Sequence, residues 1–154
     1  MGTYMIVRKI MPSEMDITIN LCRYYADEAK IPEEEYDEDH VLETIRHYST
    51  HYEYCWLNAY EGQRPVGLIA GYVCKAPWGP VYHAHCELIF MLESHRTMAN
   101  VKELLKAFEE WARIAGAKEI TAGDIGINPD RTKKLLEHLD FREGLWMSKE
   151  LNNG

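Results

Sequence analysis

A glutamate with two histidines before it lies in the middle of an apolar segment, at Glu87. Alternation along a strand puts His83 and His85 on the same face as Glu87. Ile89 and Met91 continue that face toward the end of the segment. A carboxylate in the middle of a buried strand is poorly solvated, which raises its pKa toward the range of a general base that works near neutral pH. Such an environment would suit Glu87 to act as a general base, and His85, two residues earlier on the same face, could assist or replace it.

The same residues allow other interpretations. Glu87 could form an ion pair with a neighbouring histidine or arginine, which would be structural. A His-x-His-x-Glu metal site, and with it a metal-dependent hydrolase, lacks further ligands at His83, His85 and Glu87. His47 and His51 share one face of a predicted helix, but no H-E-x-x-H motif accompanies them. Surface histidines are the default, and we expect no bound metal.

The strand that carries Glu87 is followed by a connector, residues 93–101, and then by an amphipathic helix over residues 102–116. Apolar residues recur along one face of this helix at Val101, Leu104, Leu105, Phe108, Trp111 and Ala112. Gly116 stands where a glycine ends a helix. A strand that runs into a helix N-terminus brings unpaired N–H groups and the positive end of the helix dipole to one point. Such a point suits an anion, above all a phosphate.

The other segments alternate between strand and helix patterns. We expect strands over residues 4–10, 54–60, 65–75, 82–92, 117–124 and 141–151. We expect three more helices over residues 13–30, 38–51 and 129–139. Gly67 and Gly71 interrupt the third of these strands and indicate a bulge or the close approach of another backbone.

This succession resembles the GCN5-related N-acetyltransferase (GNAT) family from about Tyr4 to Leu151. The family's signature is Arg or Gln, two residues, Gly, one residue, then Gly or Ala, on the turn between the fourth strand and its helix. The matching residues are Arg96, Thr97, Met98, Ala99, Asn100 and Val101. The arginine is kept, whereas alanine and valine replace both glycines and add side-chain atoms where backbone amides would approach the pyrophosphate of coenzyme A. The chain thus resembles a degenerate member of the family.

The resemblance also implies roles for single residues. N–H groups of residues 96–101 would hold the pyrophosphate, and Asn128 would meet the pantetheine arm. The main chain of Met91, Leu92 and Glu93 would hold the pantetheine amides. Glu87 stands where certain acetyltransferases carry the glutamate that takes a proton from the acceptor amine. Leu136 occupies the place of a tyrosine that often returns a proton to the coenzyme A thiolate, which leucine cannot do.

The fold that the resemblance implies is one α/β domain over residues 1–154. Its twisted sheet would be mixed and mostly antiparallel, with flanking helices, and its fourth and fifth strands would run parallel and part at their C-terminal ends. The predicted function is acetyl transfer from acetyl-coenzyme A to a primary amine of a small molecule or a protein. The alternative is a non-catalytic interaction protein that kept this fold and lost the cofactor signature.

Residues 27–39 carry eight carboxylates and one lysine. In the family that the chain resembles, this loop lies over the acceptor site, so it could attract a polyamine, a lysine-rich peptide or another cation. A solvated loop without a partner explains the same charge run. Trp78, on a stiff turn, could line the acceptor pocket or pack against a neighbour. Trp78 and Tyr25 are the candidate substrate contacts.

The composition limits which binding partners and which cellular compartment the sequence fits. A net charge of −8 and a pI near 5.4 argue against general binding of nucleic acid or of an anionic membrane. The four cysteines lie far apart without the spacing of a disulfide framework or a zinc site, as expected of thiols in a reducing cytoplasm. No signal peptide and no membrane-spanning run is recognised. We expect a soluble cytoplasmic protein, and a homodimer is compatible with the sequence. Its small size, acidic balance and altered glycines also resemble acetyltransferase-like proteins of bacteriophages.

Overall fold

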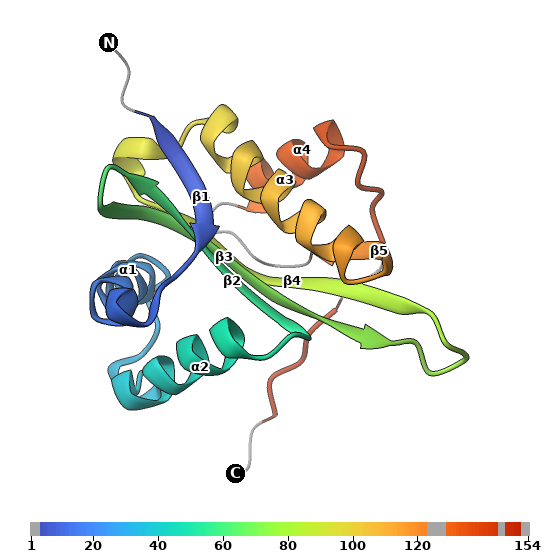
Figure 1. The fold of residues 1–154 in the computed structure, drawn as a ribbon, viewed down its shortest axis with the longest axis horizontal. Helices are drawn as coiled ribbons and strands as arrows, with labels where there is room; N and C mark the ends of the chain where they lie inside the picture. The colour runs from blue at the N-terminus through green and yellow to red at the C-terminus, as the bar shows by residue number, and fades with distance from the viewer. Residues whose placement is uncertain (1–3, 123–128, 145–146, 152–154) are drawn as a thin grey trace.

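A computed structural model describes residues 4–122, 129–144 and 147–151 and contains a five-stranded sheet with helices on both faces (Figure 1). The strands are β1 (Met5–Lys9), β2 (Tyr54–Glu61), β3 (Arg64–Lys75), β4 (Tyr82–Met91) and β5 (Ala117–Ala122). The helices are α1 (Met15–Glu28), α2 (Glu38–Thr50), α3 (Met98–Ile114) and α4 (Pro129–His138). Three short 3-10 turns are η1 (Pro12–Glu14), η2 (Glu33–Glu35) and η3 (Glu93–His95).

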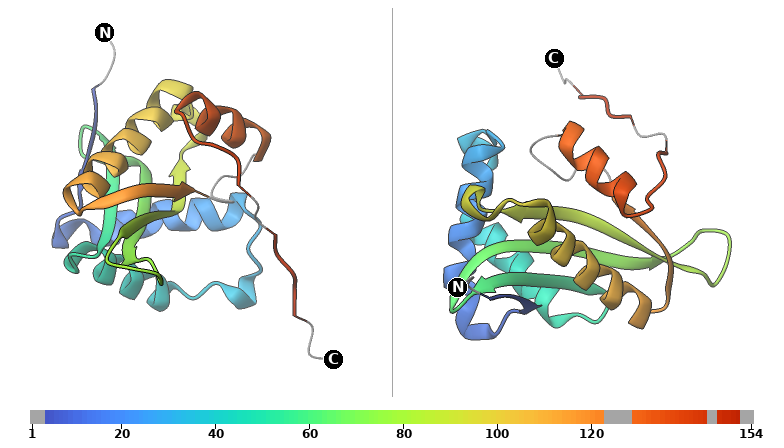
Figure 2. Two further views of the ribbon diagram at one scale, coloured as in Figure 1. Left: turned by 90° about the vertical axis from the view of Figure 1, so that its right-hand side faces the viewer. Right: turned by 90° about the horizontal axis from the view of Figure 1, so that it is seen from above.

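The strands follow one another across the sheet in chain order. The first three pairs are antiparallel, and β4 and β5 are parallel, because α3 carries the chain back across the sheet between them. Figures 1 and 2 show α1 and α2 on one face and α3 and α4 on the other. The predicted mixed, mostly antiparallel sheet with flanking helices is confirmed.

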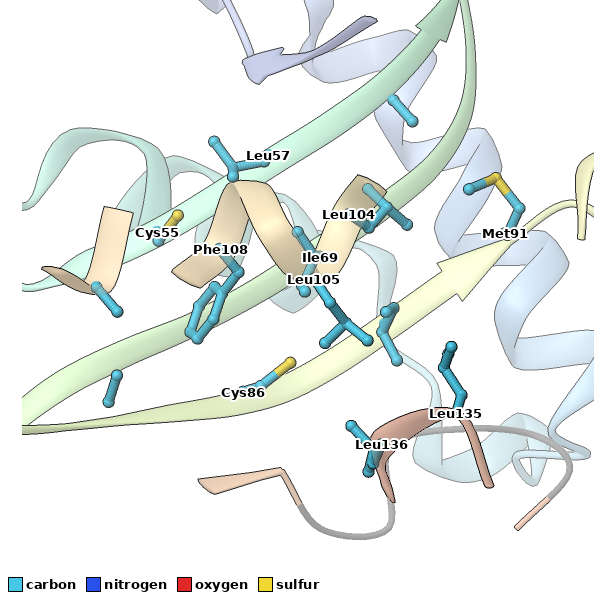
Figure 3. Close-up of a cluster of buried hydrophobic side chains, with 14 of the residues drawn as sticks. Cys55, Leu57, Ile69, Cys86, Met91, Leu104, Leu105, Phe108, Leu135 and Leu136 are labelled. Atoms are coloured by element: carbon cyan, nitrogen blue, oxygen red, sulfur yellow. The ribbon is translucent and has the colours of Figure 1, made fainter. Parts of the chain in front are cut away.

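Each face of the sheet packs its own hydrophobic cluster. Under α3 and α4 the cluster joins side chains from the sheet and both helices (Figure 3), among them Leu57, Ile69, Cys86, Leu104, Phe108 and Leu135. Under α1 and α2 a second cluster includes Leu21, Ile45, Trp56, Leu68 and Phe90. The sheet is therefore apolar on both faces, and the apolar side of two helices packs on each face.

A bulge in β4 lies at Glu87. Along the pairing with β3, Gly71 is opposite Cys86 and Ala70 is opposite Leu88, so that Glu87 has no partner. An extra residue in one strand reverses the alternation of side chains beyond it. The sequence signal for this irregularity was the glycine on the neighbouring strand, and the predicted bulge or close approach is confirmed there.

The bulge corrects the predicted faces of β4. Ile89 and Met91 do not lie on the face of Glu87, as strict alternation had predicted. They pack with Cys86 in the cluster under α3 and α4, whereas Phe90 packs in the cluster under α1 and α2. The single extra residue is the physical reason, since it moves every later side chain to the opposite face.

The predicted strand over residues 141–151 is wrong for the part that the structure describes. Residues 141–144 and 147–151 form no strand. Phe141 packs against the cluster under α3 and α4, but Met147 and Leu151 are 80% and 83% exposed. Alternation alone does not make a strand where the apolar side chains have no neighbouring surface to cover.

None of the described helices is long and apolar enough to cross a bilayer.

A buried polar contact joins α1 to the sheet. Asn58 of β2 is fully buried and donates a hydrogen bond of 2.8 Å to the hydroxyl of Thr18 in α1. The indole N–H of Trp56 donates 3.0 Å to the side-chain oxygen of Asn58. Because buried polar groups are costly when unpaired, these bonds hold α1 in one position on the sheet.

Replacing Glu14 by glutamine is expected to remove about 1–2 kcal/mol of stability at pH 7, allowing for the partial exposure of the ion pair. Arg8 donates bonds of 2.9 and 2.8 Å to this carboxylate and, as the main cause, lowers its pKa from 4.5 to about 2. A depressed pKa stabilises the fold above pH 4.5, and that contribution is lost as the pH falls toward 2.

Urea unfolding between pH 7 and pH 2.5 measures this contribution. The variant should lose less stability than the wild type between pH 4.5 and 2.5. Glu109→Gln is the matched control, because Glu109 forms an exposed ion pair with Arg113 one helical turn away. Parallel acid curves for the wild type and Glu14→Gln would contradict the prediction.

Candidate active site

A cavity of about 360 Å³ opens beside the C-terminal half of β4. The cavity is lined by residues 89–91 of β4 and by residues 96–98 at the start of α3. Side chains of α4 and of the end of α1 complete the lining. Within the described residues, the parallel pairing of β4 with β5 ends at the pair Cys86–Ala122, while β4 continues to Met91. No described residue of β5 therefore pairs with the part of β4 that lines the cavity.

The first turn of α3 borders the cavity. The helix begins at Met98, four residues earlier than predicted, because Thr97 caps it: its hydroxyl accepts a bond of 3.1 Å from the N–H of Asn100. The N–H of Val101 donates 3.1 Å to the carbonyl of Thr97 and opens the helical pattern. The N–H groups of Met98 and Ala99 have no acceptor within the helix. This end of a 17-residue helix favours an anion.

The side chains that replace the family's glycines leave this end of the helix open. Ala99 is exposed, and Val101 is half-buried at the cavity wall. Met98 is 55% exposed, and it also lines the cavity rather than filling it. Asn100 is turned to the η3 side, where its side-chain amide donates 2.8 Å to the carbonyl of His95.

Arg96 was predicted to bind the pyrophosphate through its N–H, but this N–H donates 3.2 Å to the carbonyl of Glu93, and the side chain of Arg96 is held by α1. Its guanidinium donates bonds of 2.6 and 2.7 Å to the two carboxylate oxygens of Glu28. Two further bonds, of 3.1 and 2.8 Å, run to the carbonyl of Met91. The bond from Arg96 lowers the pKa of Glu28, so that this carboxylate stays charged beside the cavity. Sequence reasoning missed Glu28, which lies 68 residues from Arg96.

The main-chain groups open to the cavity differ from those expected. The N–H of Leu92 donates 2.9 Å to the carbonyl of Val66 on β3, so it points away from the cavity. Peptide groups alternate in direction along a strand, which turns those of Ile89 and Met91 toward the edge of β4 opposite β3. The carbonyl of Met91 accepts hydrogen bonds from Arg96, and Glu93 is the first residue of η3. Ile89 was missed because its role depends on the bulge.

Glu87 lies on the α2 face, at the bulge, and is exposed. The predicted burial of this carboxylate is wrong, because Glu87 is the extra residue of the bulge and its side chain is exposed. The hydroxyl of Tyr48 in α2 donates a bond of 2.5 Å to Oε1 of Glu87. The pKa of Tyr48 is raised, mainly by burial and secondly by this hydrogen bond. The phenol therefore stays protonated and donates to the carboxylate. Only the docking of α2 reveals this pair, 39 residues apart.

His85 also lies on the α2 face. Its Nδ1 is 2.5 Å from the hydroxyl of Thr121 on β5, and its ring packs 5.2 Å from that of Tyr72. His83 lies farther from the cavity, with its Nε2 4.0 Å from a carboxylate oxygen of Glu119. No group of three or more His, Cys, Asp or Glu side chains in the described part of the chain is arranged to hold a metal ion.

The two candidate substrate contacts lie apart. Tyr25 of α1 packs edge-on against Phe90, with ring centroids 5.7 Å apart, next to the cavity. Trp78 is 76% exposed at the β3–β4 turn, the opposite end of β4 from the cavity, and packs against the ring of His83. Asn128 lies outside the described residues.

The acidic segment over residues 27–39 is partly committed to structural contacts. Glu28 pairs with Arg96, the carboxylate of Asp37 caps α2, and Glu38 pairs with Arg23. Leu136 of α4 is buried in the cluster of Figure 3, so its position supplies no proton donor. A proton for a leaving group must therefore come from elsewhere.

Comparisons with known proteins agree with this geometry. The chain matches the sequence model described as the Acetyltransferase (GNAT) family over residues 19–141. A ribosomal-protein-alanine N-acetyltransferase from Brucella melitensis biovar Abortus 2308 is similar in structure, with a TM-score of 0.74 at 18% identity over 98% of this chain and 100% of that one. The aminoglycoside N-acetyltransferase AAC(6')-Iy, solved in complex with CoA, has a TM-score of 0.74 at 17% identity over 100% of this chain and 98% of that one. No curated protein sequence matches the chain.

Proposed function

Because this chain belongs to the Acetyltransferase (GNAT) family, whose reaction is acetyl transfer from acetyl-coenzyme A to an amine, we propose that the cavity beside β4 binds acetyl-coenzyme A and that Glu87 takes the proton of the amine. One observation carries this proposal. Ile89, Phe90 and Met91 of β4 line the cavity, and Glu87, which accepts a hydrogen bond from Tyr48, lies two residues before Ile89 on the same strand, so a thioester placed along β4 would have the carboxylate close by.

The coenzyme would be held mainly by main-chain groups. The N–H groups of Met98 and Ala99 would receive the diphosphate at the positive end of α3. Ile89 and Met91 would offer peptide groups to the pantetheine arm, as a neighbouring strand would. The guanidinium of Arg96 is close enough to exchange its carboxylate partner for a phosphate, since arginine binds both in the same forked geometry.

The amine side would be served by Glu87 and Tyr48. The phenol occupies one carboxylate oxygen, which leaves the other to accept the proton of the amine. The amine nitrogen then forms a bond to the acetyl carbon as the carbon–sulfur bond breaks. The thiolate leaves and takes a proton from water, because Leu136 offers none.

Other features of the protein are part of the same proposal. The acceptor would be a cationic primary amine, which the exposed carboxylate of Glu87 would attract. The names of two similar structures contain ribosomal-protein alanine and aminoglycosides. These are two starting points for an acceptor screen. A single domain over residues 1–154, a cytoplasmic location and a homodimer stay predictions from the sequence.

Replacing Ala99 by glutamate is expected to weaken acetyl-coenzyme A binding at least tenfold and to leave α3 as stable as before or slightly more stable. A negative charge in the first turn repels a diphosphate but complements the helix dipole. Calorimetric titration with acetyl-coenzyme A measures the affinity, and thermal unfolding measures the stability. The wild type should bind in the micromolar range.

Ala99→Gln is the matched control, since it adds nearly the same volume without the charge. It should bind the coenzyme more tightly than Ala99→Glu. Equal affinity of the two variants would mean that no anion sits at this helix end. Absence of heat with the wild type at high coenzyme concentration would instead favour the non-catalytic interaction protein.

A further inference from the structure

Aromatic side chains form an in-register row across three strands on the face of α2. Tyr54 of β2 is opposite Tyr72 of β3, and Tyr72 is opposite His85 of β4. The ring centroids are 5.9 Å apart in the first pair and 5.2 Å apart in the second. We call Tyr54, Tyr72 and His85 the aromatic row. Its members are half-buried, so part of each ring faces outward.

Tyr48 connects the aromatic row to Glu87. Its ring centroid lies 4.7 Å from that of Tyr54, and its hydroxyl donates to the carboxylate of Glu87. The ring of His47 also packs against Tyr54, with ring centroids 4.4 Å apart. Helix α2 thus turns the row into one continuous surface that ends at a carboxylate.

The surface carries negative charge without a matching cation. None of the ion pairs between described residues includes Glu87. Burial and, after it, the charge of Glu87 raise the pKa of Tyr72. Aromatic rings present the negative face of their quadrupole to a cation, so the row and the carboxylate attract the same kind of group.

We propose that this surface selects as acceptor a linear aliphatic diamine or polyamine, with one ammonium group at Glu87 and the second over the aromatic row. Neighbouring strands lie about 4.8 Å apart, so the row extends about 10 Å across the sheet. A linear chain follows such a row, and its methylene groups cover the outward parts of the rings. The inference rests on the proposed function, because it names the acceptor of that site.

The test is a titration of the full chain with 1,5-diaminopentane, in the presence and in the absence of coenzyme A. The NMR signals of the tyrosine rings report the binding. The diamine should bind saturably, 1-aminopentane about fivefold more weakly, and the uncharged 1,5-pentanediol not at all. These three ligands share a five-carbon chain and carry two, one and no charged groups at its ends.

Three variants assign the contact. Tyr72→Leu should weaken diamine binding about fivefold, whereas Tyr72→Phe, which keeps the ring face, should stay within about twofold of the wild type. Tyr52→Leu is the control, because Tyr52 is 87% exposed and outside the row. Thermal unfolding of each variant verifies that the fold is kept.

Several results would overturn the inference. They are equal affinity for the diol and the diamine, unchanged binding by Tyr72→Leu, and no saturable diamine binding with or without coenzyme A. Binding of a lysine-rich peptide without binding of the diamine would also overturn it in favour of a protein acceptor. None of these results affects the coenzyme titration, so the proposed function can stand or fall by itself.

Discussion

Replacing Glu87 by glutamine is expected to lower kcat by a factor of about 100 to 1000, the range of a lost general base, while the KM for acetyl-coenzyme A stays nearly constant. Glutamine keeps the size of the side chain and can still accept a hydrogen bond from Tyr48, but it cannot take a proton. Steady-state turnover with 1,5-diaminopentane, a lysine-containing peptide and an aminoglycoside as acceptors measures the effect.

The controls for this prediction lie on the same sheet. Glu119→Gln changes a carboxylate on β5 that is 61% exposed and distant from the cavity, and it should leave kcat unchanged. Tyr48→Phe should lower kcat about tenfold, because it removes a hydrogen bond to the carboxylate and leaves the carboxylate in place. Equal losses in kcat and coenzyme affinity for Glu87→Gln would exclude it from the role of base.

Replacing Gly71 by alanine is expected to lower the free energy of unfolding by about 3 kcal/mol or more, at the upper end of overpacking effects. A Cβ at this position would lie 2.1 Å from the carbonyl oxygen of His85 and 2.7 Å from the ring of Phe108. The first contact is with backbone, which cannot rotate away, so β3 and β4 would have to separate. Urea unfolding at pH 7 measures the loss.

Gly79→Ala is the matched control, because nothing lies within 4 Å of a Cβ there and its stability should change by no more than about 0.5 kcal/mol. Gly71 is also opposite the bulge that presents Glu87, so the alanine variant should lose activity even at temperatures where it stays folded. A Gly71→Ala protein as stable as the wild type would show that the two strands can shift without cost.

Much of the fold could be predicted because its signals are local. Two apolar runs over residues 54–60 and 65–75, separated by a polar turn with a glycine, predicted β2 and β3, and the 3.6-residue spacing after Arg96 predicted α3. The start of α3 was misplaced by four residues, because the cap at Thr97 was read as part of a connector. The strand expected over residues 141–151 followed the family's succession of elements, and it is wrong for the described residues, because side chains such as Met147 and Leu151 have no surface to pack on.

The candidate site could be predicted only in part. Glu87 and the turn at Arg96 were found from residue type and from the family pattern. Their partners, Tyr48 and Glu28, were not, since each pair is brought together by the docking of a helix on the sheet. Residue spacing within one element carries no information on which residue of another element it will meet.

The sequence by itself determined the order of β1 to β5 and α1 to α4, the N–H groups without acceptors at the start of α3 and the acidic balance, because side-chain periodicity, backbone donors and charge are local properties. The tertiary structure decided which face each residue of β4 occupies beyond the bulge, what holds Arg96, and that Tyr54, Tyr72 and His85 form one row. These are consequences of register and packing between elements distant in the chain, and a one-residue shift in register would change all three.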